Sequence, residues 1–361
     1  MFTATPGYVM VGGDFSQQEP RLLAEYSNDS NMIQAYKDGK DLYATIAAGV
    51  YKNDYWDNME HHQDGTANPE GKKRRGNCKS ILLGIMYGRG NASIASQIGC
   101  SLQEANKIIE DFYASFPNVK LWIDNTTESA HKLGYVEDFW GRKRRLPDIL
   151  KKPFDVIDKN DKLSTDINPL LGSKGLITKT INPRVVYYTE QLKNANGYRQ
   201  INVLKEQAAK ENILIHDNNG FIAQAERQAV NSRVQGGAAT MSKLAMIAVH
   251  NNQQLKDLGF RMLLQVHDEL IGECPKENAD KVAELLSSIM KHSAEPVVSI
   301  PFKTDTYQVN AWYEDDFGDI VREQYKKFIS DGKLENDARH AIMDMYSELT
   351  EQQVDNFLIN C

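Results

Sequence analysis

Apolar runs next to charged residues stand out near the start of this chain and in its last third. Residues 8–11 read as a short buried strand that leads to Asp14, and a helical pattern follows over residues 18–26. Later, two apolar runs within residues 262–274 flank a charged tip that contains Asp268, a pattern that predicts a β-hairpin. We therefore expect two separate strand ends that each present a carboxylate.

Helical periodicity accounts for most of the remaining chain, and two polar segments interrupt it. We expect the polar segments at residues 53–71 and 151–219 to be insertions, with a helix near residues 188–210 inside the second. The helical patterns cover residues 31–52, 101–133 and 223–251, and two amphipathic helices after residue 319.

Composition adds the class of protein. The 361 residues include 41% hydrophobic residues, enough to bury a substantial core, and we expect a cytoplasmic protein because no signal peptide or long apolar run is present. The four cysteines lie far apart without a paired motif, which predicts free thiols. Although the net charge is -7, basic residues cluster at 72–79 and 142–145, so a local track for nucleic acid remains compatible with the sequence.

Asp14 and Asp268 are candidate ligands for metal ions. Strand ends that face one cleft can bring distant carboxylates together, and such a pair can hold two Mg²⁺ ions for phosphoryl chemistry. An isolated acidic residue at a strand end is more often a turn or a helix cap, so this interpretation depends on further signals.

A second signal is a four-residue spacing between Arg75, Lys79, Leu83 and Tyr87. In a helix this spacing places all four side chains along one face, with cations at one end and an aromatic ring at the other. Cations can bind a triphosphate, and an apolar or aromatic surface can stack on a base. The alternative is an ordinary amphipathic helix with a solvated basic end.

These residues resemble the motifs of family A DNA polymerases, the DNA polymerase I family. Residues 14–21, DFSQQEPR, are similar to motif A; residues 74–88 are similar to motif B of the fingers; and residues 265–269, QVHDE, match motif C. Residues 141–148 and 225–236 resemble two further motifs of the family, so the resemblance covers most of residues 6–313.

The resemblance implies a template-directed DNA polymerase with two Mg²⁺ ions, which Mn²⁺ can replace. Asp14 and Asp268 would hold the metals together with the carbonyl of Phe15, while Arg75 and Lys79 would bind the incoming triphosphate. Asp14, Asp268 and Lys79 are then the catalytic residues, with Lys79 as a general acid for the leaving pyrophosphate.

The remaining site residues follow from the same motifs. Glu19 would lie where a ribose 2′-hydroxyl would be placed, and would thereby select deoxyribonucleotides. The other residues expected to bind the dNTP are Gln17, Tyr43, Leu83 and Tyr87. Those expected to bind primer-template DNA are Arg227, Asn231, Gln235, His267 and Glu269, of which Glu269 would also support the metal site.

Four positions depart from the family pattern: Leu83, Tyr43, and Gln18 and Pro20, which replace the apolar residues usual beside Glu19. Leu83 stands where the family commonly has an aromatic residue, so nucleotide affinity and tolerance of sugar analogues are expected to differ. Tyr43 replaces a common phosphate-binding histidine and cannot be cationic, so its phosphate contact should be weaker.

The resemblance also predicts the fold: an α+β right-hand polymerase with an antiparallel palm sheet and helical fingers, without a thumb. The expected divisions are palm at 1–30, fingers at 31–150, an insertion at 151–222, palm at 223–318 and a helical extension at 319–361. Either the chain is one product of a split gene, with a second polypeptide that carries the thumb and an optional exonuclease as its partner, or it is a truncated reading frame; a phage is the expected source. We expect no membrane association.

Two other functions remain open from the sequence. A single-subunit RNA polymerase would share the palm and parts of the fingers helix, but Glu19 and the complete motif at 265–269 argue against it. A nucleic-acid-binding subunit that no longer catalyses is the alternative of another class, and the retained Asp14, Lys79 and Asp268 argue against it.

Overall fold

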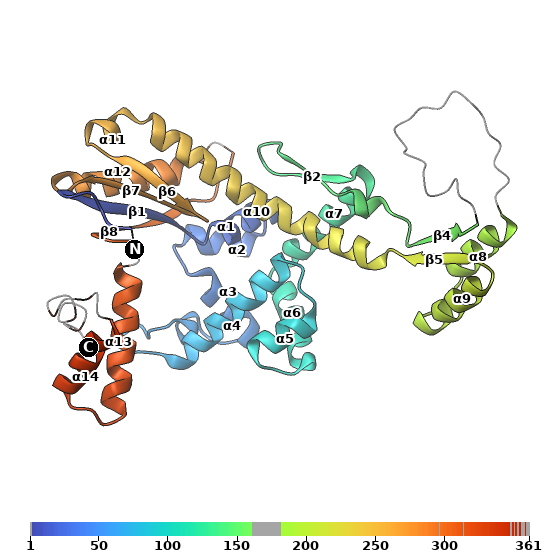
Figure 1. The fold of residues 1–361 in the computed structure, drawn as a ribbon, viewed down its shortest axis with the longest axis horizontal. Helices are drawn as coiled ribbons and strands as arrows, with labels where there is room; N and C mark the ends of the chain where they lie inside the picture. Colours follow the sequence, from blue (N-terminus) through green and yellow to red (C-terminus); the bar gives the residue numbers. More distant parts are fainter. Residues whose placement is uncertain are drawn as a thin grey trace. The chain divides into compact units, whose positions relative to one another are not determined.

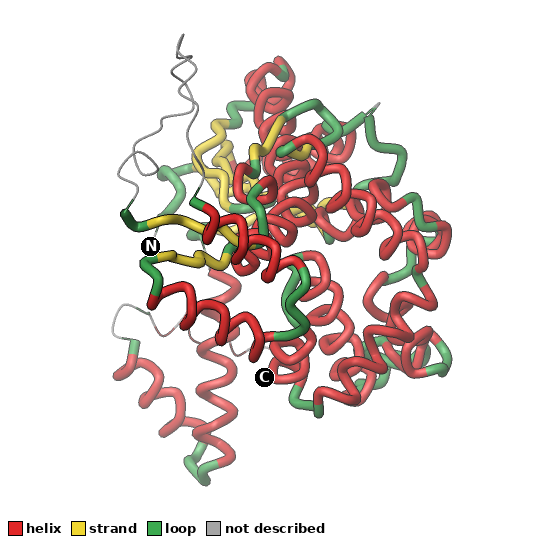
Figure 2. The backbone as a smooth tube through the Cα atoms, turned by 90° about the vertical axis from the view of Figure 1, so that its right-hand side faces the viewer, coloured by secondary structure: helices red, strands yellow, loops and turns green. Residues whose placement is uncertain are grey.

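The computed structural model describes residues 2–160, 182–295, 297–312 and 314–346, together with 349, 351, 354 and 358. The chain forms two compact units, Met1–Arg21 with Ala238–Cys361, and Leu22–Gly237. Helices and antiparallel strands are both present (Figures 1 and 2), so the expected α+β class is confirmed. In the described part of the chain, no helix has the length and apolar character that crossing a membrane requires.

The first unit is built on a four-stranded antiparallel sheet in the order β6-β7-β1-β8. Its strands are β1 (Tyr8–Ser16), β6 (Arg261–Val266), β7 (Glu269–Pro275) and β8 (Lys303–Val309). The strand predicted at residues 8–11 is confirmed but continues through Asp14 to Ser16, and the hairpin predicted around Asp268 is confirmed.

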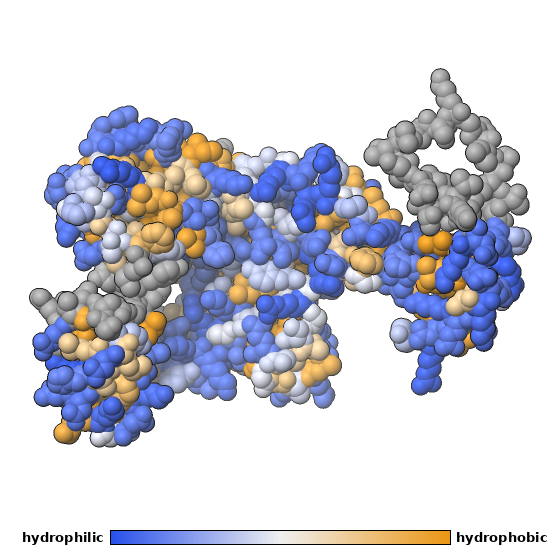
Figure 3. Space-filling model, in the orientation of Figure 1, coloured by the Kyte–Doolittle hydropathy of each residue, from blue (hydrophilic) through white to orange (hydrophobic). Residues whose placement is uncertain are grey.

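Side chains alternate between the two faces of this sheet, and helix α12 (Ala279–His292) packs on one of them. Gly13 belongs to that face, because a Cβ atom there would lie 2.9 Å from the Met290 sulfur. The opposite face carries an apolar cluster of Met10, Ile271 and Val309, and Figure 3 shows hydrophobic residues over this sheet. Gly12 and Asp14, two and four residues beyond Met10, lie on the same face as that cluster.

Helices complete the first unit. They are the start of α1 (Gln18–Ser27), the end of α10 (Asn219–Asn251), α11 (Gln253–Asp257), the 3₁₀ helix η3 (Lys276–Asn278), α13 (Glu314–Ser330) and α14 (Glu335–Met345). Val321 of α13 and Ile342 of α14 are buried together with Val354 and Leu358. The two amphipathic helices predicted at the C-terminal end are confirmed.

The second unit is mainly helical. Its helices are α2 (Ser30–Lys37), α3 (Leu42–Tyr51), η1 (Tyr55–Asn58), α4 (Pro69–Met86), α5 (Asn91–Ile98), α6 (Leu102–Ser115), α7 (Pro117–Leu133) and η2 (Pro147–Leu150), with the first part of α10. The periodic stretch 31–52 is two helices, because Gly39 takes a left-handed φ of 68° between them. The stretch 101–133 is likewise divided before Pro117.

Two small antiparallel sheets belong to the second unit. Strand β2 (Tyr135–Glu137) pairs with β3 (Lys143–Arg145), and β4 (Phe154–Asp158) pairs with β5 (Ile213–Asp217). Helices α8 (Pro183–Lys193) and α9 (Tyr198–Lys210) share an apolar cluster with β4 and β5. The single helix predicted near 188–210 is therefore wrong, since Gly197 has a φ of 89° and separates the two helices. Of the polar segment predicted at 151–219, residues 161–181 lie outside the described residues.

Candidate active site

Three carboxylates form a row across the face of the first unit's sheet that lies opposite α12. Asp14 of β1 pairs with Glu269 of β7 on one side and with Asp305 of β8 on the other. Directly opposed residues of antiparallel strands place their side chains on the same face at about 5 Å. The row therefore concentrates negative charge at the C-terminal end of β1.

Asp268 joins this row from the turn between β6 and β7. The turn contains His267, whose φ of 51° is left-handed, and Asp268 alone, so the strands reverse within two residues. The carbonyl oxygen of Asp268 accepts a hydrogen bond of 3.3 Å from the backbone N–H of Phe15. The sequence motifs around Asp14 and Asp268 thus meet in space.

The pKa of Asp14 reflects the carboxylates that surround it. Burial, then the charges of Asp268, Glu269 and Asp305, and a side-chain hydrogen bond with Asp268 raise the pKa of Asp14 to about 7 from its ordinary 3.8. A positive charge near Asp14 would stabilise its ionised form, because that charge would offset the repulsion from the neighbouring carboxylates.

The donor set fits a hard divalent cation. Carboxylate and carbonyl oxygens are the ligands that Mg²⁺ and Mn²⁺ prefer, and Mg²⁺ is commonly held by one or two carboxylates plus substrate phosphates. Within the described ranges, no group of three or more His, Cys, Asp or Glu side chains is placed to hold a metal. The expected site needs two carboxylates, Asp14 and Asp268, and the Phe15 carbonyl.

The turn after β1 carries the other candidates of this unit. Gln17 has a left-handed φ of 56° and leads directly into α1, where Glu19 stands in the first turn. Gln18, which replaces a usual apolar residue, is buried and donates to the carbonyl of Ala238 at 3.3 Å and to Ser242 at 3.2 Å. These bonds tie the start of α1 to α10 and fix the segment that carries Glu19.

In the second unit, α4 presents the four-residue face expected from the sequence. Its opposite face is buried through Cys78, Ile81, Leu82, Ile85 and Met86. Lys79 is exposed, and Arg75, Leu83 and Tyr87 are partly exposed. The helix ends at Met86 with Tyr87 as its C-cap, and Gly88 follows with a left-handed φ of 63°.

Arg75 is already bound by two carboxylates. Its Nε and Nη2 donate to Asp41 at 3.1 and 2.8 Å, and its Nη1 donates to Glu60 at 3.0 Å. Its guanidinium also lies 5.5 Å from the ring centroid of Tyr43. Arg75 and Tyr43, both expected to bind the triphosphate, are therefore neighbours, but a triphosphate would compete with Glu60 and Asp41 for Arg75.

The candidate DNA-binding residues of α10 share one face at four-residue spacing. Arg227 and Gln235 are exposed, while Asn231 has a buried Oδ1 without a hydrogen-bond partner among the described residues. The Arg227 side chain packs on Gly88, where an added Cβ would lie 2.5 Å from it. Both line a pocket of about 320 Å³, so the end of α4 and this part of α10 lie side by side.

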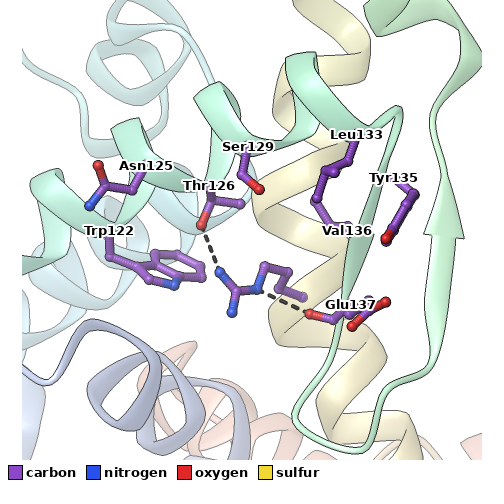
Figure 4. A pocket seen from close by; sticks show the side chains of 9 residues that line it. Trp122, Asn125, Thr126, Ser129, Leu133, Tyr135, Val136 and Glu137 are labelled. Atoms are coloured by element: carbon purple, nitrogen blue, oxygen red, sulfur yellow. Dashed lines mark hydrogen bonds between the residues drawn. The ribbon is translucent and has the colours of Figure 1, made fainter.

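Arg233 of α10 holds a basic hairpin beside that helix. Lys143, Arg144 and Arg145 of β3 are exposed. Arg233 of α10 donates to the Glu137 carbonyl at 3.2 Å and to Thr126 at 2.9 Å, beside a pocket of about 250 Å³ (Figure 4). Its guanidinium also lies over the rings of Tyr26 and Trp122, and Tyr26 stacks on Phe139 of the hairpin loop at 3.8 Å.

Several residues of these sites lacked a sequence signal, among them Glu60, Arg233 and Tyr307, whose hydroxyl donates a hydrogen bond of 2.5 Å to Glu269. Glu60 lies in a polar segment, Arg233 occupies an ordinary helical position, and Tyr307 lies in an alternating strand. Their partners are distant in sequence, so no local spacing could have revealed them.

Comparison with known proteins shows which family the chain resembles. Residues 1–314 match the family model of DNA polymerase family A. The chain is 27% identical over 313 residues to DNA polymerase I of Lactococcus lactis, covering 87% of this chain and 27% of that protein. It is 30% identical over 292 residues to the thermostable DNA polymerase I of Thermus thermophilus, covering 80% of this chain and 25% of that protein.

A solved structure shares the fold. The POL domain of Pol1 from M. smegmatis, in complex with DNA primer-template and dNTP, superposes with a TM-score of 0.59 at 23% identity, covering 86% of this chain and 41% of that one. The chain spans about a quarter of the length of the curated relatives it matches. Because the family match extends over most of its residues, the chain belongs to DNA polymerase family A.

Proposed function

We propose that this chain catalyses template-directed addition of deoxynucleotides to a primer 3′-hydroxyl, with release of pyrophosphate. The observation that carries the proposal is the meeting of Asp14 of β1 with Asp268 of the β6–β7 turn, more than 250 residues away in the chain: their side chains share a hydrogen bond, and the Asp268 carbonyl accepts from the Phe15 N–H at 3.3 Å. The named relatives are DNA polymerases, and a related POL domain binds primer-template and dNTP.

Asp14, Asp268 and the Phe15 carbonyl are the proposed ligands of two Mg²⁺ ions, which Mn²⁺ can replace. When bound, the ions supply positive charge at the attacking and leaving oxygens. The aspartates would hold the ions, and the charges of Glu269 and Asp305 beside them would make this end of the sheet attractive to cations.

The side chains of α4 bind the nucleotide in this proposal. Lys79 is exposed, and its Nζ can donate a proton to the leaving pyrophosphate. Arg75 contributes charge to the triphosphate, and Leu83 and Tyr87 provide the apolar surface for sugar and base. Gln17 and Tyr43 complete the nucleotide contacts, and Glu19 excludes a ribose 2′-hydroxyl.

The residues proposed to bind primer-template DNA are Arg227, Asn231 and Gln235 of α10 in the second unit, and His267 and Glu269 in the first unit. The exposed cations of the β2–β3 hairpin add phosphate contacts, which should make binding dependent on salt. The second polypeptide, the exonuclease, the phage source and the boundaries of palm, fingers and insertion stay predictions.

Primer extension tests the proposal. Purified chain is incubated with primer-template, Mg²⁺ and deoxynucleotides, alongside Asp14→Asn, Lys79→Ala and the control Asp257→Asn, which changes an exposed aspartate of α11. We expect extension by the wild type and the control, loss in Asp14→Asn, and a strong decrease in kcat for Lys79→Ala. Extension that persists unchanged in Asp14→Asn would contradict the proposed role of the pair.

A further inference from the structure

Tyr307 reaches from strand β8 to the carboxylate row on the sheet of the first unit. It pairs directly with Gly12 of β1, two residues along the ladder from the pair of Asp305 with Asp14. On the other side of β1, Gly12 pairs with Ile271 and Asp14 pairs with Glu269. Tyr307 and Glu269 therefore lie two strands apart on the same face, with β1 between them.

The absence of a side chain at Gly12 allows the phenol ring to cross β1. A Cβ atom at Gly12 would lie 2.2 Å from Cζ of Tyr307 and 2.4 Å from its hydroxyl oxygen. The ring thus lies directly on the glycine backbone. Its hydroxyl donates a hydrogen bond of 2.5 Å to Oε1 of Glu269.

This contact fixes a carboxylate that stands beside the proposed metal ligands. Glu269 follows Asp268 in the chain and opposes Asp14 across the ladder. With several carboxylates at one strand end, repulsion favours rotamers that turn Glu269 away from the others. A hydrogen bond to a charged oxygen opposes that movement, and the phenol is a neutral donor that adds no charge of its own.

We propose that Tyr307 is a positioning residue of the metal site, which acts by holding the Glu269 carboxylate in place beside Asp14 and Asp268. The inference rests on the proposed function, because it assumes that these aspartates bind divalent ions. Groups that orient the ligands of a metal site commonly change its affinity by about 10- to 100-fold. Since Glu269 lies outside the proposed ligand set, an effect of about tenfold is expected.

The test is Mn²⁺ binding to the full chain, measured by titration calorimetry and by the loss of the free-ion electron paramagnetic resonance signal. Tyr307→Phe keeps the ring on Gly12 and removes only the hydroxyl. Tyr8→Phe is the matched control, because Tyr8 lies on the same sheet and its hydroxyl accepts from Arg261 at 3.2 Å, away from the carboxylates. Asp268→Asn reports on the proposed metal site itself.

We expect Tyr307→Phe to weaken Mn²⁺ binding about tenfold, and Tyr8→Phe to leave it unchanged. The decisive readout is a double-mutant cycle with Glu269→Gln: if Tyr307 acts through Glu269, adding Tyr307→Phe to Glu269→Gln changes the affinity by less than about twofold. Thermal unfolding of each variant shows whether the fold is retained.

Two results would overturn the inference. Unchanged Mn²⁺ affinity in Tyr307→Phe, with binding lost in Asp268→Asn, would refute the role of Tyr307 and leave the metal site intact. Multiplicative effects of Tyr307→Phe and Glu269→Gln would show that Tyr307 does not act through Glu269. Mn²⁺ binding that is also unchanged in Asp268→Asn would instead refute the metal site on which the proposed function depends.

Discussion

Replacing Glu60 with glutamine should lower the KM for the incoming dNTP without changing kcat. In the structure Asp41 binds the Nε and Nη2 edge of Arg75, and Glu60 binds Nη1 at 3.0 Å. Because the guanidinium has five N–H donors, Asp41 can stay bound while Glu60 leaves. A triphosphate that uses Arg75 must then displace Glu60 first.

The magnitude follows from the exposure of this ion pair. The side chains of Arg75 and Glu60 are 25% and 39% exposed, so the pair should contribute about 0.2 to 1 kcal/mol. Removing that competition should lower KM by about 1.5- to 5-fold. The effect should diminish as salt is added, because exposed charges are screened.

Single-nucleotide incorporation over a range of dNTP concentrations, at low and moderate ionic strength, measures the effect. Glu70→Gln is the matched control, because Glu70 pairs with Arg74 at 3.4 Å on the same helix and its loss changes the net charge equally. An unchanged or increased KM in Glu60→Gln would refute the competition. An equal decrease in Glu70→Gln would show that only the general charge of the helix matters.

Three further predictions concern stability. Arg233→Lys should lower the free energy of unfolding by about 1 to 3 kcal/mol in denaturant titrations, because lysine cannot reproduce the two hydrogen bonds and the stacking on two rings. Gly12→Ala should be destabilising because its Cβ would collide with the Tyr307 ring, and thermal unfolding should show that Tyr307→Ala in the same chain relieves the collision. The pKa of Asp14 in the folded protein, about 7, exceeds its ordinary 3.8. The metal-free protein should therefore lose stability as the pH rises from about 4 to 7. After allowance for solvent screening, Asp14→Asn should raise the free energy of unfolding by about 1 to 3 kcal/mol in EDTA at pH 8, and by less at pH 5.

The sequence predicted those parts of the fold that local patterns encode. The strand before Asp14 and the hairpin around Asp268 have short apolar runs with clear ends, and both formed as expected. The predicted helix at 188–210 failed because periodicity continues across Gly197, although the backbone there is left-handed. Glycine readily adopts this backbone conformation and is therefore a local signal for a helix end, but the helical periodicity on either side of Gly197 favoured a continuous helix.

The site was predictable only as far as its motifs extend. Spacing placed Arg75 on an accessible face of α4, but could not show that Asp41 and Glu60 bind it, because these contacts join segments 34 and 15 residues apart. The contact of Tyr307 with Glu269 spans 38 residues and depends on the register of three strands. Such contacts are set by tertiary packing and leave no periodic trace in the chain.

The most direct measurement of the central claim is the rate of single-nucleotide incorporation by Asp14→Asn, Asp268→Asn and the double variant, each with Mg²⁺ and a primer-template. Residues that act as one unit are strongly non-additive, so each single change should remove nearly as much activity as both together. Incorporation at the wild-type rate in either single variant would contradict the account, as would two modest effects that simply multiply.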